Sequence, residues 1–203
     1  MRWPVTLAEG PVQLRPLRRR DGRTWVRLRT ENRDWLAQWE ATSPHGLLQP
    51  QSFGSLVRHH AQQARNGIAL PLAIILDDEL VGHVTLGPIT WGSLRSGAIG
   101  YWVSEHVAGQ GVTPTAVALV TDHAFLECGL HRVEINIRPE NTASLRVVQK
   151  LGFRDEGVRE RFLHIDGGWR DHRTFALTTE DVPNGIMPAW RDRLWRSGDR
   201  LAP

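Results

Sequence analysis

Apolar and polar positions alternate along this chain with two periods, one typical of strands and the other typical of helices. Apolar or alternating runs predict strands at 11–16, 70–76, 80–90, 99–103, 133–137, 153–165 and 169–178. Helical spacing predicts helices over 21–29, 35–42, 52–66, 113–129 and 141–150, and another in the tail from 182. Polar turns at 77–79 and 166–168 predict two hairpins. We expect a single α/β domain over 1–203, with 182–203 as a C-terminal helical tail.

The central part of this pattern runs from 99 to 141 and comprises a strand, a glycine turn, a long helix and a second strand. Gly109 and Gly111 allow the turn to adopt positive φ or a ligand to approach the backbone. Thr113 predicts the N-cap of the helix, with Pro114 just inside it. A helix N-terminus after a glycine turn attracts anions, because its first N–H groups lack intrahelical partners. An ordinary β-α-β connection has the same pattern, so this stretch alone leaves both interpretations open.

A second pair of motifs follows this turn: Asn141-Thr-Ala-Ser144 opens a helix, and Lys150-Leu-Gly-Phe153 ends it. Together with 108–113 they resemble the GNAT superfamily of acyl-CoA-dependent N-acetyltransferases. The segments 32–36 and 167–172 are similar to the RimJ/RimL-like branch, which acetylates the N-terminal alanine or serine of ribosomal proteins. The resemblance covers roughly residues 11–180. Ala108 and Thr113 depart from the usual phosphate-turn pattern, which predicts fewer phosphate contacts.

The resemblance implies a mixed, mostly antiparallel sheet that splays apart between two parallel strands and is flanked by helices. It implies acetyl-CoA as the acyl donor and no metal. Backbone groups of the strand ending near residue 104 would hold the pantetheine arm, and N–H groups of the turn would hold the pyrophosphate. The implied cofactor contacts are Trp102, Val103, Ser104, Gly109, Gln110, Gly111, Val112, Thr113, Asn141 and Ser144.

Candidate catalytic residues follow from the same resemblance. Ser144 would protonate the leaving thiolate; alternatively it is a polar residue of a first helical turn, as Asn141 is alternatively an N-cap. Many relatives have a tyrosine seven residues after the asparagine, where this chain has Val148, so we expect no tyrosine acid and a structural role for Tyr101. Glu134 is the candidate general base, acting directly or through water, and its alternative is an ion pair with a neighbouring His131 or Arg132.

The acceptor would lie near the first helices. Glu31, Trp35, Trp39 and His83 are the candidate acceptor contacts. Each has an ordinary alternative, because large aromatic side chains and single histidines are commonly core residues and acidic side chains commonly face solvent.

The absence of an obvious strong base favours an α-amine acceptor. An α-amine has a pKa of about 7.7–8.0 and a lysine amine about 10.4, so roughly a tenth of the former and less than about a thousandth of the latter is neutral at pH 7. The preferred acceptor is therefore a protein N-terminus, such as that of a ribosomal protein. A small-molecule amine acceptor and a non-catalytic CoA-binding sensor or interaction module remain as alternatives.

Composition further restricts the classes of partner that we expect for this chain. The formal charge of +3 is too small to predict nucleic-acid binding, and the single cysteine excludes an internal disulfide. The chain has no apolar run of membrane-spanning length and no signal-peptide core, so we expect no membrane partner and a cytoplasmic location. The sequence of the tail is compatible with two arrangements: packing on the body of the same chain, or a contact with a second subunit in a homodimer.

Overall fold

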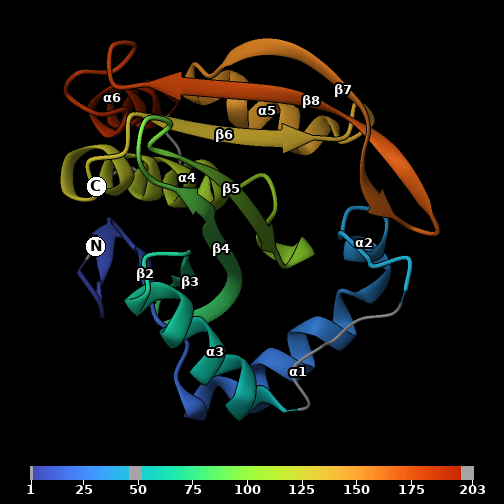
Figure 1. Ribbon diagram of the computed structural model, residues 1–203. Coiled ribbons are helices and arrows are strands. Elements are labelled where there is room, and N and C mark those ends of the chain that lie inside the picture. The colour runs from blue at the N-terminus through green and yellow to red at the C-terminus, as the bar shows by residue number, and fades with distance from the viewer. Residues whose placement is uncertain (1, 46–51, 198–203) are drawn as a thin grey trace.

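The computed structural model describes residues 2–45 and 52–197, which fold around an eight-stranded sheet of order β1-β2-β3-β4-β5-β6-β8-β7 (Figure 1). The strands are β1 (Leu7–Glu9), β2 (Val12–Arg15), β3 (Leu70–Leu76), β4 (Glu79–Thr90), β5 (Ser96–Val103), β6 (Arg132–Ile137), β7 (Arg154–Ile165) and β8 (Gly168–Thr178). The helices are α1 (Gly22–Glu31), α2 (Arg33–Ala37), α3 (Phe53–Arg65), α4 (Val112–Asp122), α5 (Thr142–Leu151) and α6 (Met187–Ser197).

The β5–β6 pair is the only parallel pair of this sheet in the described part of the chain. Its pairing ends at Ala98 and Glu134, although β5 continues to Val103 and β6 to Ile137. The two strands therefore diverge over their C-terminal halves. This confirms the expected mixed, mostly antiparallel sheet that splays between two parallel strands.

Helices cover both faces of the sheet. β3 is a continuous apolar run with all seven residues buried, as a strand covered on both sides requires. On one face, α1 and α3 enclose a small cluster that includes Leu28, Ile75 and Leu80. On the other, α4 contacts β1, β2, β4 and β5, and it lies in the larger core.

The C-terminal helix α6 packs against α4 of the same chain. The Nε1 of Trp190 donates a hydrogen bond to the Thr115 hydroxyl at 2.8 Å, and Leu194 is buried. The carboxylate of Asp122 accepts from the backbone N–H groups of Ile186 and Met187 at 2.6 and 3.1 Å. These contacts anchor the tail on the body of the molecule.

The hairpin of β7 and β8 reaches across to the segment that follows α2 (Figure 1). The backbone N–H of Thr42 donates to the carbonyl of His164 at 2.7 Å, and Ala41 forms an isolated antiparallel bridge with Ile165. Arg138, just after β6, donates to the carbonyl of Gln38 at 2.8 Å. Segments that are far apart in sequence are thus joined by backbone hydrogen bonds and by one hydrogen bond from an arginine side chain.

The predicted N-cap of α4 is wrong, and the carboxylate at the start of α1 does not cap that helix. Helix α4 begins at Val112 after Gly111, whose φ of 82° is left-handed, so Thr113 lies in the first turn and is not the N-cap. The carboxylate of Asp21 makes no cap bond to α1; it pairs with Arg15 at 2.7 and 3.0 Å and accepts from the Arg18 N–H at 2.7 Å. A buried guanidinium is a stronger partner for a carboxylate than a free helix N–H.

The strand β1 was not predicted, because it is only three residues long and has no readable alternation. The helix predicted over 113–129 is confirmed as helical, with α4 continued by a π-helical turn, His123–Glu127. Within 2–45 and 52–197, no helix combines the length and the apolar character needed to cross a membrane.

Candidate functional site

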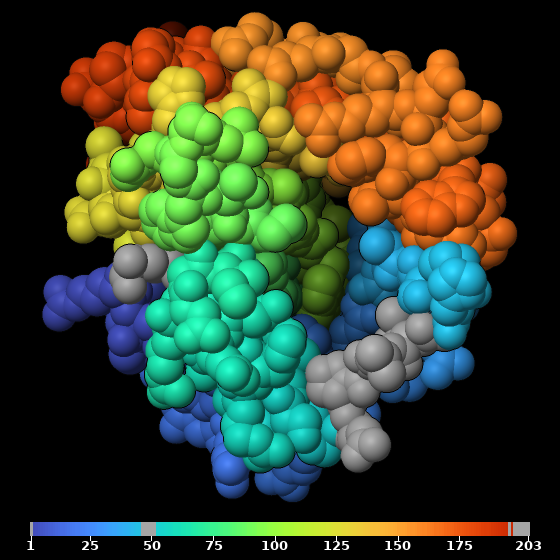
Figure 2. Space-filling model, viewed as in Figure 1, coloured from blue at the N-terminus to red at the C-terminus, as the bar shows by residue number. Residues whose placement is uncertain are grey.

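A cavity of about 920 Å³ lies where β5 and β6 diverge. It extends from the glycine turn before α4, past the start of α5, to the segment after α2 and the β7–β8 hairpin. Figure 2 shows a hollow in this region, between the light-blue segment near α2, the orange hairpin and the green strands. Of the predicted site residues, Trp35, Trp39, His83, Trp102, Val103, Gly109, Gly111, Thr113, Asn141 and Ser144 line it.

The glycine turn forms one end of this cavity. Gly109 and Gly111 both have φ of 82°, a conformation that favours glycine, and a Cβ at Gly109 would point into open space. The first N–H groups of α4 lack intrahelical acceptors and carry the positive end of the helix dipole. Neither the side chain of Gln110 nor that of Val112 lines the cavity, so their predicted contacts could come only from the backbone.

Two cationic side chains face the cavity from α5. Arg146 and Lys150 are exposed, lie one helical turn apart, and make no ion pair with any residue in the described ranges. They can hold anionic groups together with the glycine turn. Neither is among the site residues predicted from the sequence, although their i, i+4 spacing on the helix that begins at Asn141 was a usable signal.

Asn141, Ser144 and Tyr101 meet at the start of α5. The side-chain oxygen of Asn141 accepts from the Ser144 N–H at 3.0 Å, so Asn141 is an N-cap, as its alternative interpretation stated. The Tyr101 hydroxyl is buried and makes no hydrogen bond of standard geometry to the described residues. Burial raises the pKa of Tyr101 to about 12, against the opposing effect of the Ser144 hydroxyl beside it. A neutral phenol thus lies next to Ser144 in the cavity wall, a proximity that sequence alone did not indicate.

The end of β5 is fixed by α1 and α2. The Nε1 of Trp35 donates to the carbonyl oxygen of Val103 at 3.2 Å. This hydrogen bond occupies one lone pair of the Val103 carbonyl, a group predicted to contact the cofactor. Asn32 is buried; it donates to the Ser104 hydroxyl at 3.1 Å and accepts from the Glu105 N–H at 2.8 Å. Ser104 is fully buried in this network and does not line the cavity, contrary to its predicted role.

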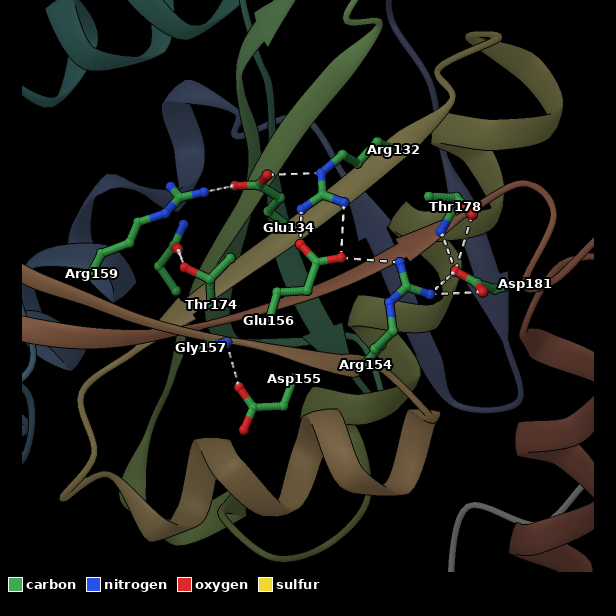
Figure 3. Close-up of polar contacts among 11 residues, drawn as sticks. Arg132, Glu134, Arg154, Asp155, Glu156, Gly157, Arg159, Thr174, Thr178 and Asp181 are labelled. Atoms are coloured by element: carbon green, nitrogen blue, oxygen red, sulfur yellow. Dashed lines mark hydrogen bonds and ion pairs between the residues drawn. The ribbon is translucent and has the colours of Figure 1, made fainter.

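Glu134 lies in a chain of ion pairs on the face of β6, β7 and β8 (Figure 3). Its two oxygens accept from Arg132 at 2.8 Å and from Arg159 at 3.0 Å, and it does not line the cavity. Arg132 also pairs with Glu156. The hydrogen bond from Arg132, together with one from Arg154 and the charges of both arginines, lowers the pKa of Glu156 to about 2. This placement agrees with the ion-pair alternative and does not support Glu134 as the general base.

The end of the cavity formed by the segment after α2 and the β7–β8 hairpin, called the acceptor end below, contains carboxylates that are paired with arginines. Glu40 binds the guanidinium of Arg29, with one oxygen at 2.6 Å, and Glu140 binds Arg138 at 3.2 Å. Glu31 is exposed, lies 4.0 Å from Arg27 and does not line the cavity, so its predicted acceptor contact is not supported.

His83 occupies the floor of the cavity at this end. Its ring lies edge-on to Trp25, with 5.5 Å between centroids, and stacks on His60 at 5.1 Å. Its Nε2 is buried without a partner in the described chain, and burial, reinforced by His60 and the positive Arg29, lowers the pKa of His83 to about 3. His83 is therefore neutral at pH 7 and is a poor proton acceptor.

Two further residues bring polar atoms to the cavity from β6 and β8. Asn136 accepts from the Thr174 hydroxyl at 2.8 Å, and His172 is 3% exposed, with its Nδ1 3.0 Å from the carbonyl of Arg170. Neither residue is among the site residues predicted from the sequence. The described residues contain no group of three or more histidine, cysteine, aspartate or glutamate side chains that could hold a metal ion.

Comparison with known proteins agrees with this geometry. The sequence model of the family described as "Acetyltransferase (GNAT) domain" matches residues 12–154. The "Probable N-acetyltransferase YjcK" of Bacillus subtilis is 31% identical over 172 residues, covering 84% of this chain and 95% of that protein. The "[Ribosomal protein uS5]-alanine N-acetyltransferase" of Escherichia coli is 28% identical over 157 residues, covering 76% and 81%.

A solved structure extends the similarity over nearly the whole chain. "Mycobacterium smegmatis RimJ in complex with CoA-disulfide" superposes with a TM-score of 0.86 and 39% identity, covering 97% of this chain and 96% of that one.

The buried His83 predicts acid-sensitive stability. The unfolded chain takes up a proton near pH 6.5 that folded His83 refuses until about pH 3, so the free energy of unfolding falls as the pH drops below 6.5. This single histidine contributes a slope of about 1 kcal/mol per pH unit between about pH 6 and 5. In denaturant titrations across this window, His83→Phe should flatten the slope by that amount.

Val84→Ala is the matched control for this measurement. It removes buried apolar volume next to His83 and should lower stability without changing the slope. A slope that is equal in His83→Phe and the wild type would contradict the assignment.

Proposed function

This chain belongs to the GNAT acetyltransferase family and is an acyl-CoA-dependent N-acetyltransferase, and from this premise we propose that it acetylates the N-terminal α-amine of a protein. The proposal rests on one observation: a single cavity connects the glycine turn with the segment after α2 and the β7–β8 hairpin. A donor held at one end and an amine entering from the other can react directly, without a covalent enzyme intermediate.

Acetyl-CoA binding in this cavity is assigned as follows. The N–H groups from Gly109 to Thr113 hold the pyrophosphate, with Arg146 and Lys150 neutralising phosphate charge. The free edge of β5 at Trp102 binds the pantetheine arm through its backbone N–H and C=O groups. The side-chain amide of Asn141 also binds this arm. This recognition is largely main-chain, so the changes at Ala108 and Thr113 are compatible with it.

Direct transfer balances without a further reactant. The amine lone pair forms the N–C bond, the C–S bond breaks with its electrons going to sulfur, and the nitrogen loses a proton. Ser144 supplies a proton to the departing thiolate and is resupplied from the neighbouring Tyr101 hydroxyl or from solvent. The products are the amide and the free thiol of CoA.

The electrostatics of the acceptor end favour an α-amine. The carboxylates that line it are paired with arginines, and His83 is too weak a base to deprotonate a lysine. Deprotonating a lysine at pH 7 costs roughly 3.5 kcal/mol more than deprotonating an α-amine. The named function of the E. coli relative, which acts on a ribosomal protein, supports a protein acceptor. An acceptor of that kind would place this enzyme in the cytoplasm.

The acceptor proposal predicts a defined pattern of activity. Thiol release from acetyl-CoA, followed by product mass, should occur with peptides that begin with free alanine or serine. It should disappear when the same peptides are blocked at the N-terminus and carry an internal lysine, because that amine is almost entirely protonated. A panel of aminoglycosides, polyamines and amino acids is the comparison. Turnover on these free amines alone would overturn the proposal in favour of a small-molecule acceptor.

The assignment of the two cations to phosphate predicts a donor-dependent defect. The double variant Arg146→Gln, Lys150→Gln should weaken acetyl-CoA binding by about tenfold or more, measured by calorimetry. Turnover with acetyl-pantetheine, which has no phosphates, should stay the same. The double variant Arg58→Gln, Arg65→Gln, at two exposed positions of α3 outside the cavity, is the charge-matched control. Equal losses with both donors would show that the cations act elsewhere.

Protonation by Ser144 predicts a loss in kcat at constant donor affinity. Ser144→Ala should lower kcat by roughly tenfold to a hundredfold, because the thiolate must leave without a positioned proton donor. Ser144→Thr keeps the hydroxyl and should retain most of the rate. If the alanine variant turns over as fast as the threonine variant, Ser144 is only a residue of the first helical turn.

A further inference from the structure

His172 on β8 is a buried imidazole that faces the reaction cavity. It lines the cavity together with Asn136, Leu163 and Ile165, at the end that the proposed function assigns to the acceptor. Only 3% of its surface is exposed, and the ring of Phe162 packs edge-on against it at a centroid distance of 5.7 Å. Its position is therefore fixed by packing on one side and open to the cavity on the other.

One hydrogen bond sets the tautomer of this imidazole. The Nδ1 lies 3.0 Å from the carbonyl oxygen of Arg170, and a carbonyl can only accept. Nδ1 must therefore carry the proton, which leaves a lone pair on Nε2. The Nε2 has no hydrogen-bond partner among the described residues, and it is not one of the fully enclosed nitrogens, unlike Nε2 of His83 and of His123.

The charges around His172 keep the ring neutral at pH 7. Burial lowers its pKa below the usual value, and Arg138 acts in the same direction. The Arg170 carbonyl, Glu140 and Asp171 oppose this shift without reversing it. A neutral imidazole with a free lone pair is the form that can accept a proton.

The other proton acceptors in the described cavity wall are occupied or enclosed. Glu40 pairs with Arg29 and Glu140 pairs with Arg138, so each carboxylate is already neutralised by a guanidinium. His83 is stacked on His60, with its Nε2 sealed from solvent. His172 alone, among the residues described there, combines a free accepting atom with a place at the acceptor end.

We propose that Nε2 of His172 is the general base that takes the proton from the attacking amine. The amine nitrogen forms its bond to the acetyl carbon and passes one proton to Nε2. This gives an imidazolium whose Nδ1–H still donates a hydrogen bond to the Arg170 carbonyl. The C–S electrons leave with sulfur, and the thiolate takes a proton from the Ser144 side. The imidazolium then returns its proton to solvent. This step rests on the proposed function for its acceptor and applies to any amine that reaches the cavity.

His172→Asn is the sharpest variant, because its amide N–H can still donate to the Arg170 carbonyl while the second ring nitrogen is lost. With an alanine-terminated peptide, kcat should fall by about a hundredfold or more. Acetyl-CoA affinity, measured by calorimetry, should remain within about twofold, since the proposed donor contacts do not include His172. His131→Gln is the matched control; this histidine is exposed, pairs with Glu180 and lies outside the cavity.

A second readout separates proton transfer from a structural effect. In the wild type and in His131→Gln, kcat at saturating substrates should fall with a single protonation below about pH 6.5, because the imidazolium cannot accept a proton. In His172→Asn this limb should vanish. Should that variant not fold, the wild-type profile decides alone: a kcat that stays flat over the acid range in which the protein remains folded overturns the proposal.

A kcat for His172→Asn within about threefold of the wild type also overturns it. The same comparison runs with whichever amine the acceptor panel identifies. A wild type that uses only small amines therefore refutes the N-terminal proposal, while the role of His172 is still decided by its own variant.

Discussion

The structure depends on the loss of pairing between β5 and β6 after Ala98 and Glu134. Two parallel strands that separate leave backbone N–H and C=O groups without sheet partners, and such groups are costly unless something else satisfies them. The chain restrains both loose ends from outside the pair. β5 is held by β4 and by the indole of Trp35 on the Val103 carbonyl, and β6 is held by β8. The edges that remain open between them are available to a ligand, and the cavity follows from this geometry.

The charges of the molecule are arranged so that few of them reach this cavity unpaired. Glu134 is taken by Arg132 and Arg159, and Glu40 is taken by Arg29. The cations Arg146 and Lys150 are left free at the end where phosphates would bind. At the acceptor end the unpaired titratable groups described are buried imidazoles, kept neutral by desolvation. An amine arriving there meets neutral groups, which is the condition under which a weak base suffices.

The parts of the fold that are local in sequence could be predicted, and the parts that depend on distant partners could not. The turn before α4 is indicated by Gly109 and Gly111, because glycine readily adopts positive φ. The start of α5 is indicated by Asn141, because asparagine is a favoured N-cap residue. The arginine that neutralises Glu134 from β7 is 25 residues away, and nothing in the pattern of β6 points to Arg159. Tyr101 and Ser144 are 43 positions apart in the sequence and meet only in the folded cavity wall, so the position at which many relatives have a tyrosine did not indicate this phenol.

One end of the cavity is formed mainly by backbone groups and the other by side chains. This difference explains why family membership predicts the acetyl donor better than it predicts the acceptor. The donor end is mainly backbone, positioned by a glycine turn and a helix start, so it survives changes such as Ala108 and Thr113. The acceptor end is made of side chains from two segments joined across 122 residues, where Thr42 meets His164. Substitutions in those segments can reshape acceptor access without touching the donor site. Sequence similarity therefore transfers the acetyl donor between relatives, while the acceptor has to be established for each chain.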